Sequence, residues 1–419
     1  MLTKDEFKKL PIFISSMSRL DDDLSSASIA LAKVLSRANP VYYIEYPFTW
    51  LDLLRKRNYP KMLKRLPSLL FGKHCLIPVK GQSENLLGSI PSPGLPIFSL
   101  PPGFIQRIGI KYNNHCIVSL VNRIKKQKMI NHYIFVNSFN PVYLSKINQH
   151  LQPSLSMYHS RDAIEELKSD WLNSENDCVQ QYDLVMASSK KLCRNISDRN
   201  TRPVNYFPNG GDSQLFRTAV DLTLPRPTEL LGIKTPIIGY TGAICQRIDY
   251  ELLGKIAIAH KDKTIVLVGP RRDKGNTSIQ LDSFPNIVFI ESKSIDALPS
   301  YLSYFDCAII PFVKNNLTKG IYPLKINEYL GAARAVVTTN FSEDISDFKE
   351  QVYLANSHDE FLQMVEMAVN DNSLDKVNIR LKTAETNSWE QRVELFWQLA
   401  WNTYLKKNRL SFDLSKLAN

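Results

Sequence analysis

Residues 237–270 read IIGYTGAICQRIDYELLGKIAIAHKDKTIVLVGP and contain one complete strand-helix-strand unit. The apolar runs at 237–243 and 264–270 predict two strands, and the stretch 249–260 between them predicts a helix. Strands that alternate with helices in this way pair in parallel, and the helices cover both faces of the sheet. This stretch therefore predicts an α/β fold.

The same alternation extends over nearly the whole chain. Further strands are predicted at 11–17, 41–46, 133–138, 154–160, 183–189, 204–210, 286–292, 306–312 and 335–339, and further helices at about 24–35, 325–333, 357–370 and 389–407. The sequence thus predicts two doubly wound, mostly parallel sheets. Ligands of such sheets bind beyond the carboxyl ends of the strands, so we expect a site in a cleft between the two domains.

One segment breaks the alternation and divides the chain. Residues 212–235 include two prolines and show no clear period, which is typical of a linker. We therefore expect a first Rossmann-like domain over 1–211 and a second over 236–388. Residues 389–419 are expected to form a C-terminal helix and tail, with an aromatic stripe that packs back on the body of the protein.

The composition is that of a globular protein. The 419 residues are 44% hydrophobic and 22% charged, with a mean hydropathy of −0.21. No apolar run approaches the ~18 residues that a membrane span needs, and the N-terminus lacks the pattern of a secretory signal. The six cysteines include no CxxC motif, which argues against a zinc ribbon or a dense disulfide framework and favours a reducing cytoplasm.

The segment 315–339, NNLTKGIYPLKINEYLGAARAVVTT, carries the pattern that points most directly to chemistry. Pro323 suits the first turn of a helix, so Lys325 lies near a helix N-terminus, where backbone N–H groups already attract an anion. Glu328 follows about one turn later on the same face and could accept hydrogen bonds from ribose hydroxyls. An ordinary Lys–Glu pair on the helix surface is the alternative, and the residues alone leave both interpretations open.

This segment resembles the donor-site signature of glycosyltransferases with the GT-B fold, in which two Rossmann-like domains face a cleft. The likeness is to family 4 and its relatives in bacterial teichuronic-acid and exopolysaccharide synthesis. Three further segments agree in the expected order: ENDCVQQYDLVMASSKKL (175–192), FPNGGDSQLF (207–216) and IIGYTGAICQRIDYELLGKIA (237–257). The similarity covers more than half of the chain, from about Met157 to Tyr404.

The resemblance implies a glycosyltransferase whose second domain binds a nucleotide-sugar donor, linked to UDP or GDP. The glutamate that grips the ribose in the family corresponds to Glu328, and Pro323, Leu324 and Lys325 form the turn before it. The family's second glutamate, eight residues earlier, is replaced here by Gly320. Lys325 is therefore expected to hold the diphosphate.

The resemblance also implies a glycine turn and a basic side chain near the diphosphate. Gly242 matches the glycine, and Arg247 is the nearest basic residue, one place away from the usual lysine. Such cations can stabilise a diphosphate leaving group without a metal. We see no DxD metal motif, because Asp21–Asp23 lies at a predicted helix start, where capping explains it better. A metal-independent reaction is predicted, and the likeness to family 4 favours retention of the anomeric configuration.

The first domain is expected to bind the acceptor. MYHSRDAIEEL (157–167) follows a predicted strand and offers His159 and Asp162 as candidate catalytic residues. In the resembling families a His or an Asp near this point touches the donor sugar or acts as base. An inverting reaction would need one of them to remove the acceptor proton, whereas in a retaining reaction the side chain only positions. Alternatively, Asp162 caps a helix over 163–167.

The net charge of +11 is concentrated in residues 51–150, which hold 15 basic and only two acidic residues. Two segments, 51–73 and 104–128, interleave Lys and Arg with Leu, Ile or Phe, as does a helix that lies in a membrane interface. We expect them to dock the protein on the anionic inner face of the cell membrane, beside a lipid-linked or polysaccharide acceptor. The alternative is a solvated basic face on ordinary helices.

Two other functions stay open. A nucleotide-sugar 2-epimerase uses the same two domains, but it would leave the charge of 51–150 unexplained. A nucleic-acid-binding protein would use that charge, yet the segment lacks aromatic-stacking modules and a helix-turn-helix pattern, so we expect no nucleic-acid partner.

Overall fold

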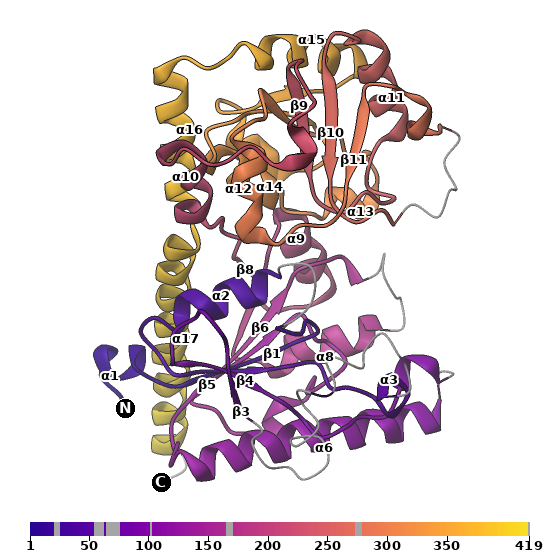
Figure 1. Ribbon diagram of the computed structural model, residues 1–419. Helices are drawn as coiled ribbons and strands as arrows, with labels where there is room; N and C mark the ends of the chain where they lie inside the picture. Colours follow the sequence, from indigo (N-terminus) through magenta and orange to yellow (C-terminus); the bar gives the residue numbers. More distant parts are fainter. Residues whose placement is uncertain are drawn as a thin grey trace. The chain divides into compact units, whose positions relative to one another are not determined.

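The computed structural model describes residues 1–20, 26–53, 63, 76–100, 103–164, 171–272 and 279–417. Asp21–Asp23 and most of the basic segment 51–73 lie outside these residues. The chain divides into two compact units (Figure 1). Unit 1 comprises Met1–Ser188, Leu192–Phe207 and Val393–Asn419, and unit 2 comprises Ser189–Lys191 and Pro208–Arg392.

Unit 1 is built, in its described part, on an eight-stranded sheet. The strands are β1 (Ile12–Ser16), β2 (Val41–Ile44), β3 (Leu76–Pro78), β4 (Leu86–Ser89), β5 (Ile134–Ser138), β6 (Leu155–Ser160), β7 (Leu184–Ala187) and β8 (Asn205–Tyr206). Their order is β3-β4-β2-β1-β5-β6-β7-β8, and neighbours are parallel except for β3 and β4. The chain therefore reverses its direction across the sheet between β1 and β5.

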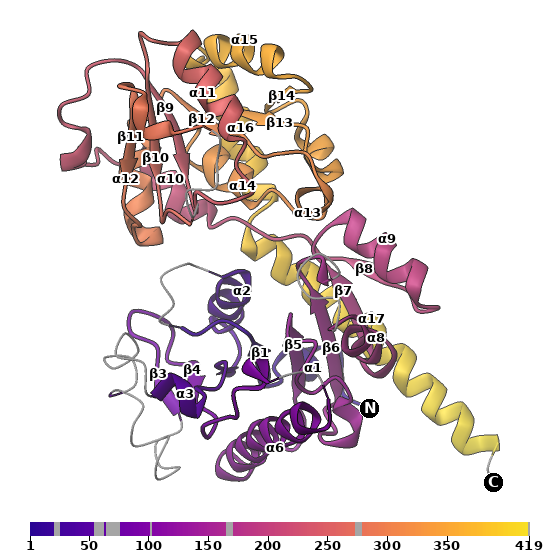
Figure 2. The same ribbon diagram turned by 90° about the vertical axis from the view of Figure 1, so that its right-hand side faces the viewer.

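Helices cover both faces of this sheet (Figure 2). They are α1 (Lys4–Lys8), α2 (Ala27–Leu35), α3 (Trp50–Leu53), α6 (Phe104–Gln127), α8 (Leu172–Gln181) and α9 (Lys190–Arg199), whose first two residues belong to unit 2. Ser28 of α2 hydrogen-bonds to Tyr43 of β2. Leu120 of α6 shares a buried cluster with Tyr42 and Phe13. Because Tyr42 and Tyr43 are successive strand residues, α6 and α2 lie on opposite faces.

The predicted C-terminal helix is present as α17 (Trp389–Leu417), which belongs to unit 1 from Val393 onward. The ring of Phe7 in α1 lies 6.1 Å from Trp397, 5.5 Å from Trp401 and 4.6 Å from Tyr404, measured between centroids. Nζ of Lys407 pairs with the carboxylate of Asp183 at 2.8 Å. The aromatic stripe thus packs on the body of unit 1, as the sequence predicted.

Unit 2 contains, in its described part, a six-stranded sheet in which all neighbours are parallel. The strands are β9 (Ile237–Thr241), β10 (Thr264–Val268), β11 (Ile287–Ile290), β12 (Cys307–Ile310), β13 (Ala335–Thr339) and β14 (Tyr353–Ala355). Their order is β11-β10-β9-β12-β13-β14. Each sheet is doubly wound, so the fold class predicted from the alternation of strands and helices is confirmed.

Two groups of helices flank the sheet of unit 2. They are α10 (Ser213–Asp221), α11 (Tyr250–Ala259), α12 (Leu298–Leu302), α13 (Asn316–Lys319), α14 (Leu324–Gly331), α15 (His358–Val369) and α16 (Leu374–Thr386). Helix α10 contacts α12, α14 and α16, whereas α11 contacts α15. Residues 212–235, which we expected to be a linker, contain α10 and lie in unit 2, because Phe216 and Ala219 of this helix are buried in its core.

Shorter elements complete the chain. Single 3₁₀ turns occur at Ile97–Ser99, Ile147–Gln149, Thr228–Leu230, Leu281–Ser283, Ile295–Ala297 and Glu343–Phe348. Strands β3, β4 and β14 and helix α16 were not predicted from the sequence. Among the described residues, no helix combines the length and the apolar character needed to cross a membrane.

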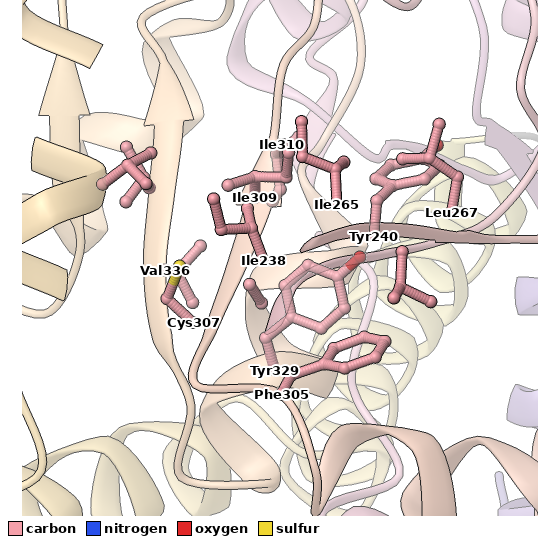
Figure 3. Packing of buried hydrophobic residues seen from close by; sticks show 14 of the residues in the cluster. Ile238, Tyr240, Ile265, Leu267, Phe305, Cys307, Ile309, Ile310, Tyr329 and Val336 are labelled. Carbon is pink, nitrogen blue, oxygen red and sulfur yellow. The ribbon is translucent and has the colours of Figure 1, made fainter. Parts of the chain in front are cut away.

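The core of unit 2 is tightly packed where β9 passes Phe305. Figure 3 shows Phe305 and Tyr329 among the side chains of the central strands. A Cβ atom at Gly239, in the middle of β9, would overlap the ring of Phe305. Phe305 is itself buried, so the ring has little room to move. The missing side chain at Gly239 therefore lets an aromatic residue pack against the central strand.

We expect Gly239→Ala to lower the free energy of unfolding by about 1–3 kcal/mol, because the added methyl group overpacks the core. Urea unfolding followed by circular dichroism measures this change. Gly232→Ala is the matched control, because nothing lies within 4 Å of a Cβ at that position. An equal unfolding midpoint for the two variants would contradict this account of the core.

Candidate functional site

The order of the strands in unit 2 singles out one edge of its sheet. From β9 the chain extends to one side through β10 and β11, and then to the other side through β12, β13 and β14. In open parallel sheets, ligands bind beyond the carboxyl ends of the two strands that flank this reversal. Those strands are β9 and β12, so the residues that follow Thr241 and Ile310 are the first candidates.

Two glycines bring the loops after β9 and β10 together. Gly242 has a φ of 138° and Gly269 a φ of 151°, values that favour glycine. A Cβ atom at Gly269 would overlap the carbonyl oxygen of Gly242, and the N–H of Gly242 donates to the carbonyl of Val268 at 2.8 Å. Gly242 thus forms the sharp bend expected from the sequence. Its partner Gly269 was not singled out, although it directly follows a predicted strand.

The side chain of Lys325 extends over Gly242. A Cβ atom at Gly242 would lie 2.5 Å from Nζ of Lys325, so the glycine leaves room for this ammonium group. Nζ also lies 5.5 Å from the ring centroid of Tyr240, within the range of a cation–π contact. Burial lowers the pKa of Lys325, while the charge of Glu328 opposes this shift and that of Arg247 adds to it.

Glu328 lies one turn after Lys325 on α14, and both side chains are half-buried. Burial raises the pKa of the Glu328 carboxyl, and the positive charge of Lys325 opposes that shift. Among the residues that the structure describes, no salt bridge joins the two. They are therefore not the surface ion pair that the sequence left open. Each charge is close enough to act on the other, and each is left available to a ligand.

Arg247 belongs to the same edge of the sheet. Its side chain is half-buried, and its Nε donates to the sulfur of Cys245 at 3.4 Å. The carbonyl of Arg247 accepts a hydrogen bond of 2.9 Å from the N–H of Val313, just after β12. This bond ties the loop after β9 to the chain that leaves β12. The structure thus brings Gly242, Arg247, Lys325 and Glu328 together.

The start of α14 differs slightly from the prediction. Pro323 is the cap residue that precedes the helix, and Leu324 is its first residue. The N–H of Ile326 donates to the carbonyl of Pro323 at 2.9 Å, which begins the first turn. Lys325 therefore still lies in the first turn of the helix, where exposed N–H groups favour an anion.

Tyr329, which the sequence analysis did not single out, attaches this helix to β9. The N–H of Thr241 donates to the Tyr329 hydroxyl at 2.9 Å, and the Thr241 hydroxyl lies 3.3 Å from the same oxygen. Both residues are buried. A tyrosine one residue after Glu328 could have been noticed, but its partner lies 88 positions away in the chain.

Two glycines of the segment 207–216 serve packing. A Cβ atom at Gly211 would lie 2.8 Å from Cβ of Asn327 in α14, and one at Gly210 would lie 2.7 Å from the backbone nitrogen of Trp389. The N–H of Trp389 donates to the carbonyl of Gly211 at 3.0 Å. This loop therefore supports α14 from the side that carries Asn327.

The two candidate catalytic residues, His159 and Asp162, lie in unit 1. His159 is the penultimate residue of β6 and is 2% exposed, with its ring 5.2 Å from that of Phe207. Burial and the charge of Arg161 lower the pKa of His159 to about 3, so the imidazole is neutral at neutral pH. Asp162 is half-buried in the bend after β6. Helical backbone begins at Ile164, and residues 165–170 lie outside the described part.

No protein-family model matches this sequence. A curated relative, the "Putative teichuronic acid biosynthesis glycosyltransferase TuaH" of Bacillus subtilis, is 25% identical over 244 residues. The match covers 56% of this chain and 60% of that relative, so the chain spans less than two thirds of the relative's length.

Solved structures of similar fold cover almost the whole chain. A sucrose-phosphate synthase from Thermosynechococcus elongatus matches with a TM-score of 0.60 at 14% identity, over 98% of this chain and 100% of that one. A structure described as "Trehalose-6-phosphate from E. coli bound with UDP-2-fluoro glucose" has a TM-score of 0.63 at 13% identity, over 94% of this chain and 99% of that one. A glycosyltransferase from Rickettsia africae has a TM-score of 0.56 at 13% identity, over 96% and 98%. Identities this low show the fold alone, and that fold is the pair of Rossmann-like domains called GT-B.

Proposed function

We propose that this protein is a glycosyltransferase that moves a sugar from a nucleoside-diphosphate sugar to an acceptor. The observation that carries the proposal is the position of Lys325, whose ammonium lies over Gly242 at the strand-order reversal of unit 2, with Arg247 and Glu328 beside it. The relative from Bacillus subtilis is named as a glycosyltransferase, and the Escherichia coli structure is described as bound to a UDP-sugar analogue. Both support this reading of the site.

In this proposal the diphosphate of the donor lies on the bend at Gly242. Lys325 and Arg247 supply two positive charges there, and the absent side chain at Gly242 leaves space for phosphate oxygens. When the bond to the sugar breaks, negative charge develops on the diphosphate, and fixed cations stabilise that charge. Two cations perform this task without a metal ion, so we expect the reaction to need none.

Glu328 is assigned to the ribose of the donor. An ionised carboxylate can accept hydrogen bonds from two neighbouring hydroxyl groups. These bonds are stronger than hydrogen bonds to a neutral acceptor. Burial raises the pKa of Glu328 because the carboxylate loses contact with water, and hydrogen bonds from ribose hydroxyls would stabilise the ionised form instead. The base of the nucleotide, uracil or guanine, stays open.

His159 and Asp162 are assigned to the acceptor and to the transferred sugar. A buried imidazole whose pKa is lowered to about 3 is a weak base, so His159 suits a neutral hydrogen-bonding role. If the reaction inverts the anomeric centre, Asp162 is the better candidate to remove the acceptor proton. If it retains the configuration, both side chains position the sugars, and we favour retention.

Lys325→Ala and Glu328→Gln should each weaken the binding of UDP or GDP about tenfold to a hundredfold, because each removes a charged hydrogen-bonding partner. Isothermal titration calorimetry of the purified protein with each nucleotide, with and without EDTA, measures this loss. EDTA should leave the affinity of the wild-type protein unchanged.

The exposed residues Lys319 and Glu350 provide matched controls for this experiment. Lys319→Ala and Glu350→Gln remove the same charges from the same unit and should bind the nucleotide as the wild-type protein does. Binding of one nucleotide that neither Lys325→Ala nor Glu328→Gln reduces would reject the assigned site. Conversion of the nucleotide sugar to its 2-epimer without an acceptor would favour the epimerase instead.

The affinity for the nucleotide should pass through a maximum with pH. Affinity falls with decreasing pH as Glu328, whose pKa is raised, takes up a proton. It also falls with increasing pH as Lys325, whose pKa is lowered, loses its charge. Titrations over a pH series should show the alkaline decrease in the wild-type protein and not in Lys325→Ala. In Glu328→Gln the decrease in affinity at low pH should become smaller. The decrease that remains should come from protonation of the phosphate groups of the nucleotide.

We also propose that the acceptor is lipid-linked or part of a surface polysaccharide, and that unit 1 docks on the inner face of the cell membrane through the start of α6. One face of α6 is buried under the sheet (Figure 2). On the opposite face Phe104, Ile105, Ile108 and Tyr112 are 70%, 66%, 48% and 39% exposed. These four residues are called the apolar stripe below.

Basic residues flank the apolar stripe. Arg107 and Lys111 are exposed on the same two turns of α6, and residues 104–127 include no acidic residue. Exposed apolar side chains next to cations match the two layers of an anionic membrane surface, the acyl chains and the charged headgroups. The basic segment 51–73 is expected to add to this surface, but most of it lies outside the described residues.

The double variant Ile105→Ser/Ile108→Ser should reduce binding to vesicles of phosphatidylglycerol and phosphatidylcholine at least about tenfold, because two apolar side chains no longer enter the bilayer. Sedimentation with the vesicles measures the bound fraction. The double variant Ile258→Ser/Ile379→Ser, which alters two exposed isoleucines of unit 2, is the control and should bind normally. Binding of RNA that falls steeply with salt, without vesicle binding, would support the nucleic-acid alternative.

A further inference from the structure

The carboxyl edge of the unit 1 sheet carries a second polar cluster, at the reversal between β1 and β5. Ser16 ends β1, Ser138 ends β5, and His159 lies near the end of β6. Ser16 pairs with Ser138, and Ser138 pairs with His159, in the register of the parallel strands. Paired residues of neighbouring strands point to the same face, so the three side chains lie side by side. Arg161 follows two residues after His159, just beyond the strand.

Most of the polar atoms in this cluster have no partner in the part of the chain that the structure describes. Oγ of Ser138 and Nε of Arg161 are buried and make no hydrogen bond, and neither ring nitrogen of His159 forms one of normal geometry, although the backbone of Phe207 lies near enough to raise the pKa of His159. Ser16 differs, because its hydroxyl hydrogen-bonds to that of Ser28 at 2.8 Å. Buried polar atoms in proteins are nearly always paired, so a group of unpaired ones on one face indicates a ligand site.

Arg161 is the one cation of this cluster, and no carboxylate of the described residues pairs with it directly. Burial lowers the pKa of Arg161, and the negative charge of the Asp162 carboxylate opposes this shift. Among the described residues, the guanidinium forms no salt bridge with Asp162 or any other carboxylate. The charge of Arg161 also reaches His159, whose pKa it lowers together with burial. The backbone of Phe207 opposes this shift, and the imidazole is neutral at neutral pH.

The backbone holds Arg161 in place while its side chain stays without a partner. The hydroxyl of Ser188 donates to the carbonyl of Arg161 at 3.1 Å, and the N–H of Ser188 donates to the carbonyl of Ser160 at 3.0 Å. The side chain is half-buried, so a ligand can reach it. A fixed backbone with an unpaired guanidinium is an arrangement that suits binding better than packing.

We propose that Arg161, His159 and Ser138 bind an oxyanion, a phosphate or carboxylate group, carried by the acceptor. The inference rests on the proposed glycosyl transfer and names the chemical class of its acceptor. A guanidinium N–H, an imidazole N–H and a hydroxyl are all hydrogen-bond donors, which matches an anion of several oxygens. The hydroxyl and the second imidazole nitrogen also accept hydrogen bonds, so the feature that favours an anion is the guanidinium charge, which a neutral sugar would leave uncompensated. The acceptor is therefore a sugar phosphate, a lipid-linked phosphate or a sugar acid.

Calorimetric titration of the full chain with inorganic phosphate and with glucuronate tests the proposal. Every variant is made in a protein that also carries Lys325→Ala, so that binding of phosphate or glucuronate to the donor site of unit 2 does not contribute to the measured heat. Arg161→Gln should weaken the binding of the preferred anion about tenfold or more, because it removes a charged donor. Arg161→Lys should retain part of the affinity for the anion. Ser138→Ala should reduce this affinity less than Arg161→Gln does. Arg37→Gln, at an exposed position of unit 1, is the matched control and should bind as the Lys325→Ala protein does.

The imidazole of His159 provides a readout that a merely structural role of Arg161 would not move. Addition of phosphate should shift the ring resonances of His159 in nuclear magnetic resonance spectra and raise its pKa, because an anion stabilises the imidazolium. Arg161→Gln should raise this pKa without any ligand, since it removes a neighbouring positive charge. Spectra of Arg161→Gln also show whether this variant is folded.

The outcomes separate this inference from the proposed function. In the otherwise unaltered protein, Arg161→Gln should leave UDP or GDP affinity within about twofold, because the donor is assigned to unit 2. Loss of nucleotide binding equal to that in Lys325→Ala would overturn the inference, and so would anion binding that is absent or indifferent to Arg161. A chain that binds no nucleotide but binds phosphate through Arg161 would reject the proposed function while the anion site stands.

Discussion

The hydrogen bonds between the Tyr329 hydroxyl and Thr241 are the attachment on which the candidate donor site depends. They hold α14 against the last residue of β9, inside a core where both partners are buried. Because Lys325 lies one turn before Tyr329 on the same helix, this attachment sets where its ammonium reaches. The bend at Gly242 then leaves room for that ammonium, and Gly269 leaves room for the bend.

Burial has a different effect on the ionisable groups of the two units. In unit 2 a lysine and a carboxylate share one edge, so each charge partly offsets the cost of burying the other. In unit 1 a guanidinium stands beside a neutral imidazole, and the charge of Asp162 only partly offsets its burial. The first arrangement suits a ligand that has both an anionic group and hydroxyl groups. The second suits the anionic group of a ligand.

Helix α6 has one face that is buried in the core of unit 1 and another that exposes apolar side chains to solvent. Its buried residues complete the core of unit 1, so the position of the helix is fixed by the sheet. The apolar stripe on its outer face contributes nothing to that core. Exposed apolar side chains scattered singly are common, whereas a stripe flanked by cations and without acidic residues suits the anionic membrane surface proposed above.

The alternation of strands and helices, and with it the two doubly wound sheets, could be predicted from the sequence alone, because buried parallel strands need apolar runs. The sequence also placed Gly242, Lys325 and Glu328 correctly after strands or at a helix start. Strands β3 and β14 were not predicted, because they are short and are edge strands of their sheets. Helix α10 was missed because it was grouped with the proline-containing stretch that follows it, although Ser213–Asp221 contains no proline and is amphipathic. Its packing on α12, α14 and α16 makes it part of unit 2.

The polar groups that meet in the folded protein could not be predicted in the same way. Tyr329 and Thr241 are 88 residues apart in the chain, and Ser138 is brought beside His159 by the register of two strands. The pattern of apolar residues specifies which face of an element is buried, since burial repeats with the period of the helix or strand. It does not specify which distant residue lies opposite, because strand order and register arise from the packing of the whole unit.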